Sequence, residues 1–146
     1  MTMALSQAGL ALIKSFEGCC LKAYLDSIGI PTIGYGHIDG VKLGDVITQE
    51  QADQFLQDDV ESKVKDVNKA LAVEVTQAQF DALVSFTFNL GTKKLKKSTL
   101  LRRINKGEAD DCADEFLRWD RAGGGVVAGL TRRRKAEREM FVGQQA

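Results

Sequence analysis

The sequence predicts an α+β fold with a small β-containing lobe near the N-terminus and a larger helical lobe after it. Between Lys22 and Leu43, β-branched and aromatic residues alternate with glycines, as in short strands joined by turns. From Thr48 onward, apolar residues recur at helical spacing almost to the end of the chain. With 146 residues, 44% of them hydrophobic and 27% charged, the chain resembles one globular domain. We therefore expect a single domain over residues 1–146, with lobes at about 16–47 and 48–146.

The first expected element is a short helix over residues 7–17. Ser6 is a typical N-cap residue, and Gly18 is a natural stop at the other end. Glu17 is then the last residue of the helix, where its carboxyl group can turn toward the residues that follow. The helix is expected to pack on the helical lobe. The apolar side chains that share one face are Leu10, Ile13 and Phe16.

The segment from Lys22 to Leu43 is expected to form two or three short strands. Pro31, the only proline, and the surrounding string SIGIP are typical of a turn. Fully extended, the chain from Asp26 to Thr32 would span roughly 20 Å. A turn between these two residues therefore brings Thr32 back near Asp26.

Five helices are expected after these strands. Thr48 with Gln51, and Thr76 with Gln79, form the capping-box pattern that begins a helix. The helix after Thr76 is the most apolar and is expected to be central, with Gly91 at its end. The helix after Thr48 is long enough to connect the lobes. The remaining helices are expected over residues 99–105, 108–122 and 131–142.

Glu17 and Asp26 lie where the two lobes are expected to meet, and a cleft between lobes is a favoured place for a ligand. Cleavage of a glycosidic bond needs a proton donor for the leaving oxygen. It also needs a carboxylate on the other side of the sugar, acting as nucleophile or through a water. Glu17 and Asp26 can supply these two groups, and Thr32 can hold the water through its hydroxyl. The alternative explanation is two solvated charges at a helix end and a turn.

The three residues form a Glu-x8-Asp-x5-Thr pattern within the strings FEG, AYLDS and GIPTIGYGH. Further matching strings are ITQEQADQFLQDDV, TQAQFDALVSFTFNLG, STLLRRIN, FLRWDRAGG and GLTRRRKAERE. On these motifs the sequence resembles the phage-type lysozymes, or endolysins, of glycoside hydrolase family 24. Members of that family hydrolyse the β-1,4 bond between N-acetylmuramic acid and N-acetylglucosamine in peptidoglycan. The resemblance also implies the two-lobed, lysozyme-like α+β fold with the active-site cleft between the lobes.

By this resemblance, Glu17 is the general acid, Asp26 activates water or stabilises the transition state, and Thr32 positions the water. The resemblance implies a muramidase of a phage or prophage that lyses bacteria, with water as second substrate and no cofactor. Inversion or retention of configuration stays open, because the gap between the carboxyl groups decides it. Four further residues are candidates for binding the substrate: Tyr35, Ile38, Phe88 and Asn89.

Two aromatic residues are possible functional residues, but we interpret both as structural. His37, the only histidine, can act as a proton shuttle, yet a histidine at the end of a glycine-flanked strand is more often a hydrogen-bonding partner. Trp119 can stack on a sugar, but its helical spacing with Phe116 and Cys112 favours burial.

The charges are distributed unevenly although the net charge is zero. Residues 1–91 carry 6 Lys+Arg and 12 Asp+Glu, whereas residues 92–146 carry 14 and 8. This polarity fits docking on an anionic polymer, and it equally fits solvated helix faces. The strings KKLKK at 93–97 and TRRRKAER at 131–138 leave a nucleic-acid binder as an alternative. The chain lacks a recognition-fold signature, so we expect no nucleic-acid partner.

Cys19, Cys20 and Cys112 make an odd number of cysteines, which argues against a disulfide framework. We interpret them as reduced thiols. Adjacent cysteines lack C-x-x-C spacing and His37 has no histidine partner, so no metal site is expected.

No run of about 18 apolar residues occurs, and nothing near the N-terminus resembles a secretory signal. We expect a monomer that accumulates in the host bacterial cytoplasm and reaches the periplasm and cell wall by a holin-dependent route. It would meet peptidoglycan there without stable membrane insertion. Two alternatives remain, a non-catalytic peptidoglycan-binding module and a lytic transglycosylase. The complete Glu, Asp and Thr set favours hydrolysis over both.

Overall fold

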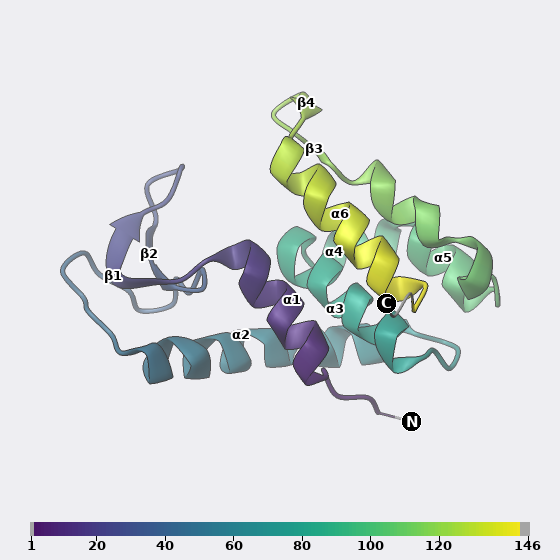
Figure 1. Ribbon diagram of the computed structural model, residues 1–146, viewed down its shortest axis with the longest axis horizontal. Helices are drawn as coiled ribbons and strands as arrows, with labels where there is room; N and C mark the ends of the chain where they lie inside the picture. The colour runs from purple at the N-terminus through teal and green to yellow at the C-terminus, as the bar shows by residue number, and fades with distance from the viewer. Residues whose placement is uncertain (1, 144–146) are drawn as a thin grey trace. The chain divides into compact units, whose positions relative to one another are not determined.

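The computed structural model describes residues 2–143 and has the predicted α+β composition (Figure 1). Helices make up most of the described chain, and its four strands form two small two-stranded sheets. The α-helices are α1 (Gln7–Glu17), α2 (Gln49–Ala70), α3 (Gln77–Leu90), α4 (Thr92–Lys97), α5 (Thr99–Asn105) and α6 (Ala128–Phe141). The 3₁₀ helices are η1 (Ala109–Asp111) and η2 (Ala113–Arg118). The strands are β1 (Cys20–Leu25), β2 (Pro31–Gly34), β3 (Arg121–Ala122) and β4 (Gly125–Val126).

The chain forms two compact units. One unit is Ala11–Ser62, and the other comprises the residues up to Leu10 and those from Lys63 onward. Helices α1 and α2 each contribute residues to both units. The predicted lobe boundaries at 16–47 and 48–146 stay a prediction.

The capping signals in the sequence correctly mark where the helices begin. Before α3, Thr76 accepts a hydrogen bond from the backbone N–H of Gln79, and the Gln79 side chain accepts one from Thr76 N–H, which completes the capping box. The same reciprocal pair precedes α2. Two serine hydroxyls also accept N–H groups from the first turns of α1 and α5. They belong to Ser6, which accepts from Gly9, and to Ser98, which accepts from Leu101.

In the 11–62 unit, β1 and β2 form an antiparallel hairpin with Tyr24 opposite Thr32 and Leu25 opposite Pro31. The register shifts between Cys20 and Tyr24, which marks a bulge or irregularity in β1. The expected small sheet is therefore confirmed with two strands. It begins at Cys20, two residues earlier than the predicted segment.

In the other unit, α3 is the central helix, as predicted, because its residues 79–87 are all buried. Helix α6 packs against both α3 and η2 (Figure 1). Phe116 makes edge-to-face ring contacts with Phe86 and Phe141, at centroid distances of 5.6 and 5.2 Å. The first turn of α1 also reaches α3, since Ser6 N–H donates to the Asp81 carboxylate at 3.1 Å.

The helix predicted over 108–122 is wrong. The segment forms η1, η2 and then strand β3. Its backbone N–H groups bond three residues back, as in Asp111 to Glu108 and Glu115 to Cys112, both at 3.0 Å. Aspartates favour turns and caps because their side chains compete for backbone hydrogen bonds, and this segment has four. The spacing of Cys112 and Phe116 correctly indicates burial but does not separate a 3₁₀ from an α-helix.

The last helix begins at Ala128, three residues before the predicted Thr131, because the β3–β4 hairpin ends just ahead of it. Sequence analysis also missed the short helix α4. Its four lysines at 93, 94, 96 and 97 are exposed around buried Leu95, which fits the solvated interpretation of KKLKK.

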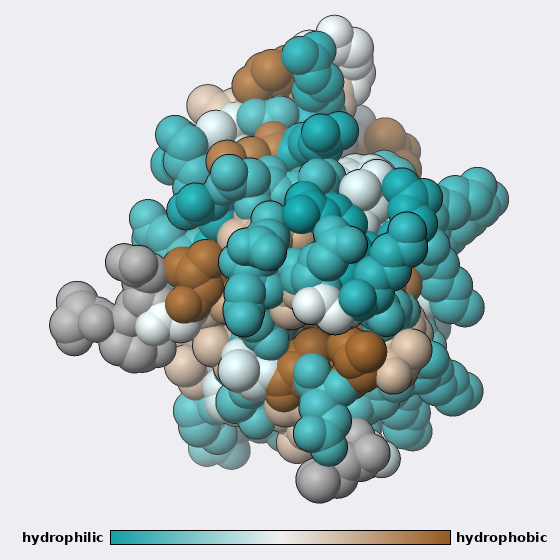
Figure 2. All heavy atoms as spheres, turned by 90° about the vertical axis from the view of Figure 1, so that its right-hand side faces the viewer, coloured by the Kyte–Doolittle hydropathy of each residue, from teal (hydrophilic) through white to brown (hydrophobic). Residues whose placement is uncertain are grey.

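Two arginines of the basic segment 131–138 are buried, although the predicted roles of this segment, in binding an anionic polymer or in a solvated helix face, require exposed side chains. Arg133 and Arg134 are 4% and 0% exposed, and both form ion pairs with fully buried Glu137, at 3.3 and 3.1 Å. The Glu137 carboxylate also accepts a hydrogen bond from Ser85 of α3. A solvated-face interpretation is therefore wrong for these two residues. On the molecular surface, the face drawn in Figure 2 is mainly hydrophilic, with hydrophobic residues in small separate patches.

Candidate active site

Glu17 is the last residue of α1 and is half-buried. Gly18, with φ of +67°, then turns the chain out of the helix in a conformation that favours glycine. The Glu17 carboxylate approaches the segment after β2 so closely that a methyl group at Gly36 would lie 3.4 Å from Oε1. The end of α1 and the end of β2 therefore meet at this carboxyl group.

Asp26 is the first residue after β1, and it organises the hairpin turn. Its Oδ1 accepts backbone N–H groups from Ile28 at 2.9 Å and Ile30 at 2.8 Å. Its own N–H donates to the Ile30 carbonyl at 3.0 Å, and Gly29 completes the turn with φ of +84°. Among the residues that the structure describes, Oδ2 makes no hydrogen bond. One carboxylate oxygen thus fixes the turn while the other can accept from a water or a substrate.

Thr32 lies in β2 and is 4% exposed. Its hydroxyl donates to the Ile30 carbonyl at 2.8 Å. A hydroxyl has one donor and two acceptor lone pairs, so this bond leaves Thr32 Oγ1 only as an acceptor. The oxygen is therefore suited to receive an O–H from a bound water.

The structure brings the three predicted residues into one compact unit, Ala11–Ser62. Asp26 and Thr32 share the end of the β1–β2 hairpin, and the backbone of Ile30 bonds to both side chains. Glu17 joins them through Gly36, which follows β2.

Tyr24 also belongs to this group, although sequence analysis did not single it out. Burial raises the pKa of its phenol, followed by the negative charges of Cys20, Asp26 and Glu17. Its position two residues before Asp26 is a signal, because alternate residues share a face in extended backbone, and Asp26 directly follows the strand. The pairing with Thr32 becomes apparent only once the strand register is known.

The two predicted substrate residues of the 11–62 unit have different surroundings. The hydroxyl of Tyr35 accepts a hydrogen bond from Gln49 at 3.1 Å, and the Lys14 ammonium lies 5.6 Å from its ring centroid. Ile38 is 53% exposed. Both can face a ligand, and their part in substrate binding stays a prediction.

His37 is held as a structural residue, as interpreted from the sequence. Its Nδ1 lies 2.8 Å from Asp59 Oδ2, and its ring stacks on Phe55 with centroids 4.2 Å apart. Both partners come from α2, so the histidine ties the segment after β2 to that helix.

Phe88 and Asn89 belong to the other compact unit, at the half-buried end of α3. Asn89 accepts a hydrogen bond from Arg134, which fixes the orientation of its amide. Trp119 is half-buried and packs edge-to-face on Phe86 at 5.6 Å, which agrees with the burial interpretation. A role of Phe88 and Asn89 in substrate binding stays a prediction.

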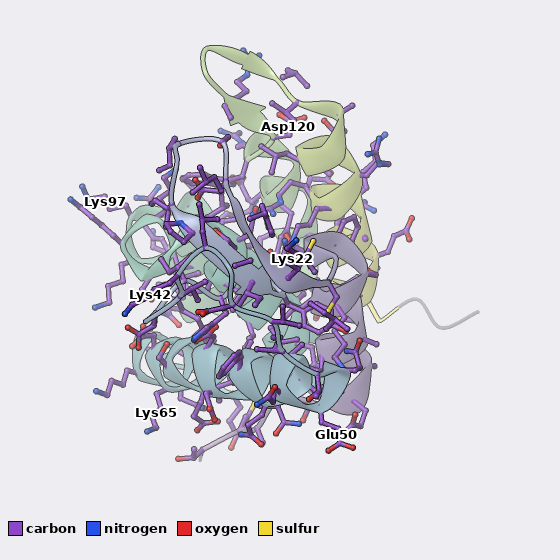
Figure 3. All side chains as sticks on the ribbon, turned by 90° about the vertical axis from the view of Figure 1, so that its left-hand side faces the viewer. Lys22, Lys42, Glu50, Lys65, Lys97 and Asp120 are labelled. Carbon is purple, nitrogen blue, oxygen red and sulfur yellow. The ribbon has the colours of Figure 1, made fainter. Side chains whose placement is uncertain are left out.

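The 11–62 unit carries a strong negative charge, with 3 lysines against 9 acidic residues. Figure 3 shows Lys22 on the hairpin, Lys42 on the loop that follows it and Glu50 in the first turn of α2. This excess of carboxylates disfavours binding of nucleic-acid phosphates in the unit that contains the site.

The thiols of all three cysteines are free, with Cys19 and Cys20 exposed and Cys112 buried. Within residues 2–143, no cluster of three or more His, Cys, Asp or Glu side chains has a geometry that could hold a metal ion. Within the same range, no helix combines the length and the apolar character needed to span a membrane.

The arrangement of helices and hairpin is shared with known structures. An endolysin from Escherichia coli O157:H7 phage FAHEc1 has a TM-score of 0.90 and 47% identity, covering 97% of this chain and 95% of that chain. The muramidase domain of SpmX from Asticaccaulis excentricus has a TM-score of 0.89 and 40% identity, covering 95% and 97%. The fold and the carboxylate site thus define a lysozyme-like α+β protein.

Residues 14–137 match the model of the phage lysozyme family. The endolysin of Bacillus phage B103 is 50% identical over 143 residues, which are 96% of this chain and 54% of that protein. This chain belongs to the phage lysozyme family. It spans about half the length of the Bacillus phage endolysins that it matches.

Proposed function

We propose that this protein is a phage or prophage endolysin that hydrolyses the β-1,4 bond between N-acetylmuramic acid and N-acetylglucosamine in peptidoglycan. The observation that carries the proposal is the hairpin that holds Asp26 and Thr32 together, with Glu17 beside it. Membership of the phage lysozyme family and similarity to endolysins and a muramidase domain support the same activity.

The proposed reaction uses each of the three residues once. Glu17 donates a proton to the glycosidic oxygen that leaves. Oδ2 of Asp26 and Oγ1 of Thr32 hold a water. This water attacks the anomeric carbon as the glycosidic bond breaks, and the proton that it loses passes to the Asp26 carboxylate. The geometry of Asp26 supports this role, because two backbone N–H groups hold its other oxygen in place. Proton NMR can identify which anomer of the product forms first. An inverted anomer indicates direct attack by water, whereas a retained anomer indicates a covalent glycosyl intermediate on Asp26.

The substrate places the site of action in the bacterial cell wall. Accumulation in the host cytoplasm, followed by holin-dependent passage through the inner membrane, is the release route that we propose. The support for that route is the similarity to endolysins of phages.

The test is a digestion of purified peptidoglycan, with the new sugar ends identified by mass spectrometry. We expect new reducing N-acetylmuramic acid ends. Anhydro-muramic acid ends would instead identify a lytic transglycosylase. Binding to peptidoglycan without any new ends would identify a non-catalytic module.

A further inference from the structure

Tyr24 lies directly beside the candidate catalytic residues. In the β1–β2 hairpin it is the cross-strand partner of Thr32. Opposite residues of an antiparallel pair project from the same face, with Cβ atoms about 4.5–5.5 Å apart. Asp26 follows two residues later, directly after the end of the same strand. The phenol ring therefore stands on the face of the hairpin that carries Thr32.

Tyr24 is also the accessible member of this pair. It is 41% exposed, whereas Thr32 is 4% exposed. A tyrosine offers a large apolar ring and a polar hydroxyl at its tip, which together suit a ligand that is apolar on one side and polar at its edges. A pyranose ring has this character, with C–H groups on its faces and hydroxyls around its rim.

The charges of both catalytic candidates reach the phenol. The negative charges of Asp26 and Glu17 raise its pKa, after burial and the Cys20 charge. A phenol with a raised pKa stays protonated at neutral pH and can donate a hydrogen bond.

The hydrogen bonding of the Tyr24 hydroxyl differs from that of the other tyrosine. Across residues 2–143 the Tyr24 hydroxyl makes no hydrogen bond, whereas the hydroxyl of Tyr35, the other tyrosine, accepts one from Gln49. An accessible hydroxyl that makes no hydrogen bond within residues 2–143 has its hydrogen-bonding capacity left for a ligand.

We propose that Tyr24 is a substrate-binding residue, whose ring packs on the face of a saccharide unit and whose hydroxyl bonds to a polar group of that unit. This inference rests on the proposed muramidase function. It adds a residue of the β1–β2 hairpin that holds the glycan against Asp26 and Thr32, which the same hairpin positions.

Binding is measured without turnover in the Glu17→Gln protein, with purified peptidoglycan as the probe. Tyr24→Leu, which removes the ring and the hydroxyl, is expected to weaken binding at least about tenfold. Tyr24→Phe, which removes only the hydroxyl, is expected to weaken it about two- to tenfold, as for one hydrogen bond. Leu25→Ala is the matched control, because Leu25 is the next residue of β1 and is 52% exposed. It should bind as the parent does.

A second readout does not depend on how well the variants fold. The chain has two tyrosines, so 3-fluorotyrosine labelling gives two fluorine NMR signals, and Tyr24→Phe assigns them. Adding a peptidoglycan-derived oligosaccharide of N-acetylglucosamine and N-acetylmuramic acid should shift the Tyr24 signal. An unshifted Tyr24 signal at saturating oligosaccharide, or parent-like binding by Tyr24→Leu, would overturn the inference while the wild type still cleaves peptidoglycan. A wild type that neither cleaves nor binds peptidoglycan would overturn the proposed function, and this inference with it.

Discussion

At the residue scale, the two oxygens of Asp26 have separate tasks. Oδ1 accepts two backbone N–H groups, from Ile28 and Ile30, and so holds the hairpin turn. Oδ2 makes no hydrogen bond within residues 2–143, so it can accept from the water of the proposed reaction. A substitution can therefore remove the charge of the Asp26 carboxylate and still keep the hydrogen bonds that hold the turn.

Asp26→Asn keeps an acceptor oxygen for the turn but replaces the second oxygen by an NH₂ group, which donates. We expect a folded protein with nearly unchanged thermal stability and a cleavage rate about 10²- to 10⁴-fold lower, because the base is lost. Thermal unfolding and peptidoglycan solubilisation measure the two effects. Asp26→Ala should lose activity and stability together. An Asn variant with a wild-type rate would exclude Asp26 from the reaction.

Gly36→Ala tests the close approach of the backbone to Glu17. With φ of +83°, an alanine there is expected to cost about 1–2 kcal/mol of stability, and its methyl group would lie in contact with Glu17 Oε1, at 3.4 Å. The control is Gly40→Ala, which has a similar φ of +70° but open space around it. Urea unfolding should show similar losses in the free energy of unfolding for both variants. Only Gly36→Ala should also lose activity. Equal activities of the two variants would mean that the space between Gly36 and Glu17 is not needed for activity.

The sequence singles out Glu17, Asp26 and Thr32 as candidates because their Glu-x8-Asp-x5-Thr pattern lies within motifs that resemble the phage-type lysozymes. It does not identify Tyr24. The reason is physical, since the partner of a strand residue depends on register, and a shift between Cys20 and Tyr24 changes which residues face each other.

At the scale of elements, local hydrogen bonds could be predicted, and long-range burial could not. The caps at Ser6, Thr48, Thr76 and Ser98 depend on residues three positions away, so the helix starts were visible in the sequence. The 3₁₀ turns over 109–118 share an apolar spacing with an α-helix. The burial of Arg133 and Arg134 depends on Glu137 and on Ser85 of α3, which a local reading of a basic segment does not include.

Glu137→Gln tests the buried ionic cluster. Burial raises the pKa of Glu137, and two guanidinium groups and the Ser85 hydroxyl oppose that effect. Removing the carboxylate leaves two buried arginines without this counter-charge, so we expect a loss of about 3–5 kcal/mol in the free energy of unfolding. Glu139→Gln, on the exposed face of the same helix, should change stability little. Equally small changes in the free energy of unfolding for Glu137→Gln and Glu139→Gln, measured in urea, would show that the cluster is not important for stability.

At the scale of the whole molecule, Cys112 makes stability depend on pH. Burial raises the pKa of its thiol to about 11, from an ordinary value near 9.0. Below pH 9 the thiol is protonated in both states, and its contribution to stability is complete. As the pH rises from 9 to 11, the unfolded state releases the proton first, so this contribution is progressively lost. The free energy of unfolding should therefore fall more steeply over this window in the wild type than in Cys112→Ala. Parallel curves would contradict the burial of this thiol.

The rate of peptidoglycan cleavage by Glu17→Gln tests the central claim most directly. Glutamine has nearly the same shape but no acidic proton, so we predict a folded protein that still binds peptidoglycan and cleaves it about 10²- to 10⁴-fold more slowly. A folded Glu17→Gln protein that cleaves peptidoglycan at the wild-type rate would contradict the account of this site.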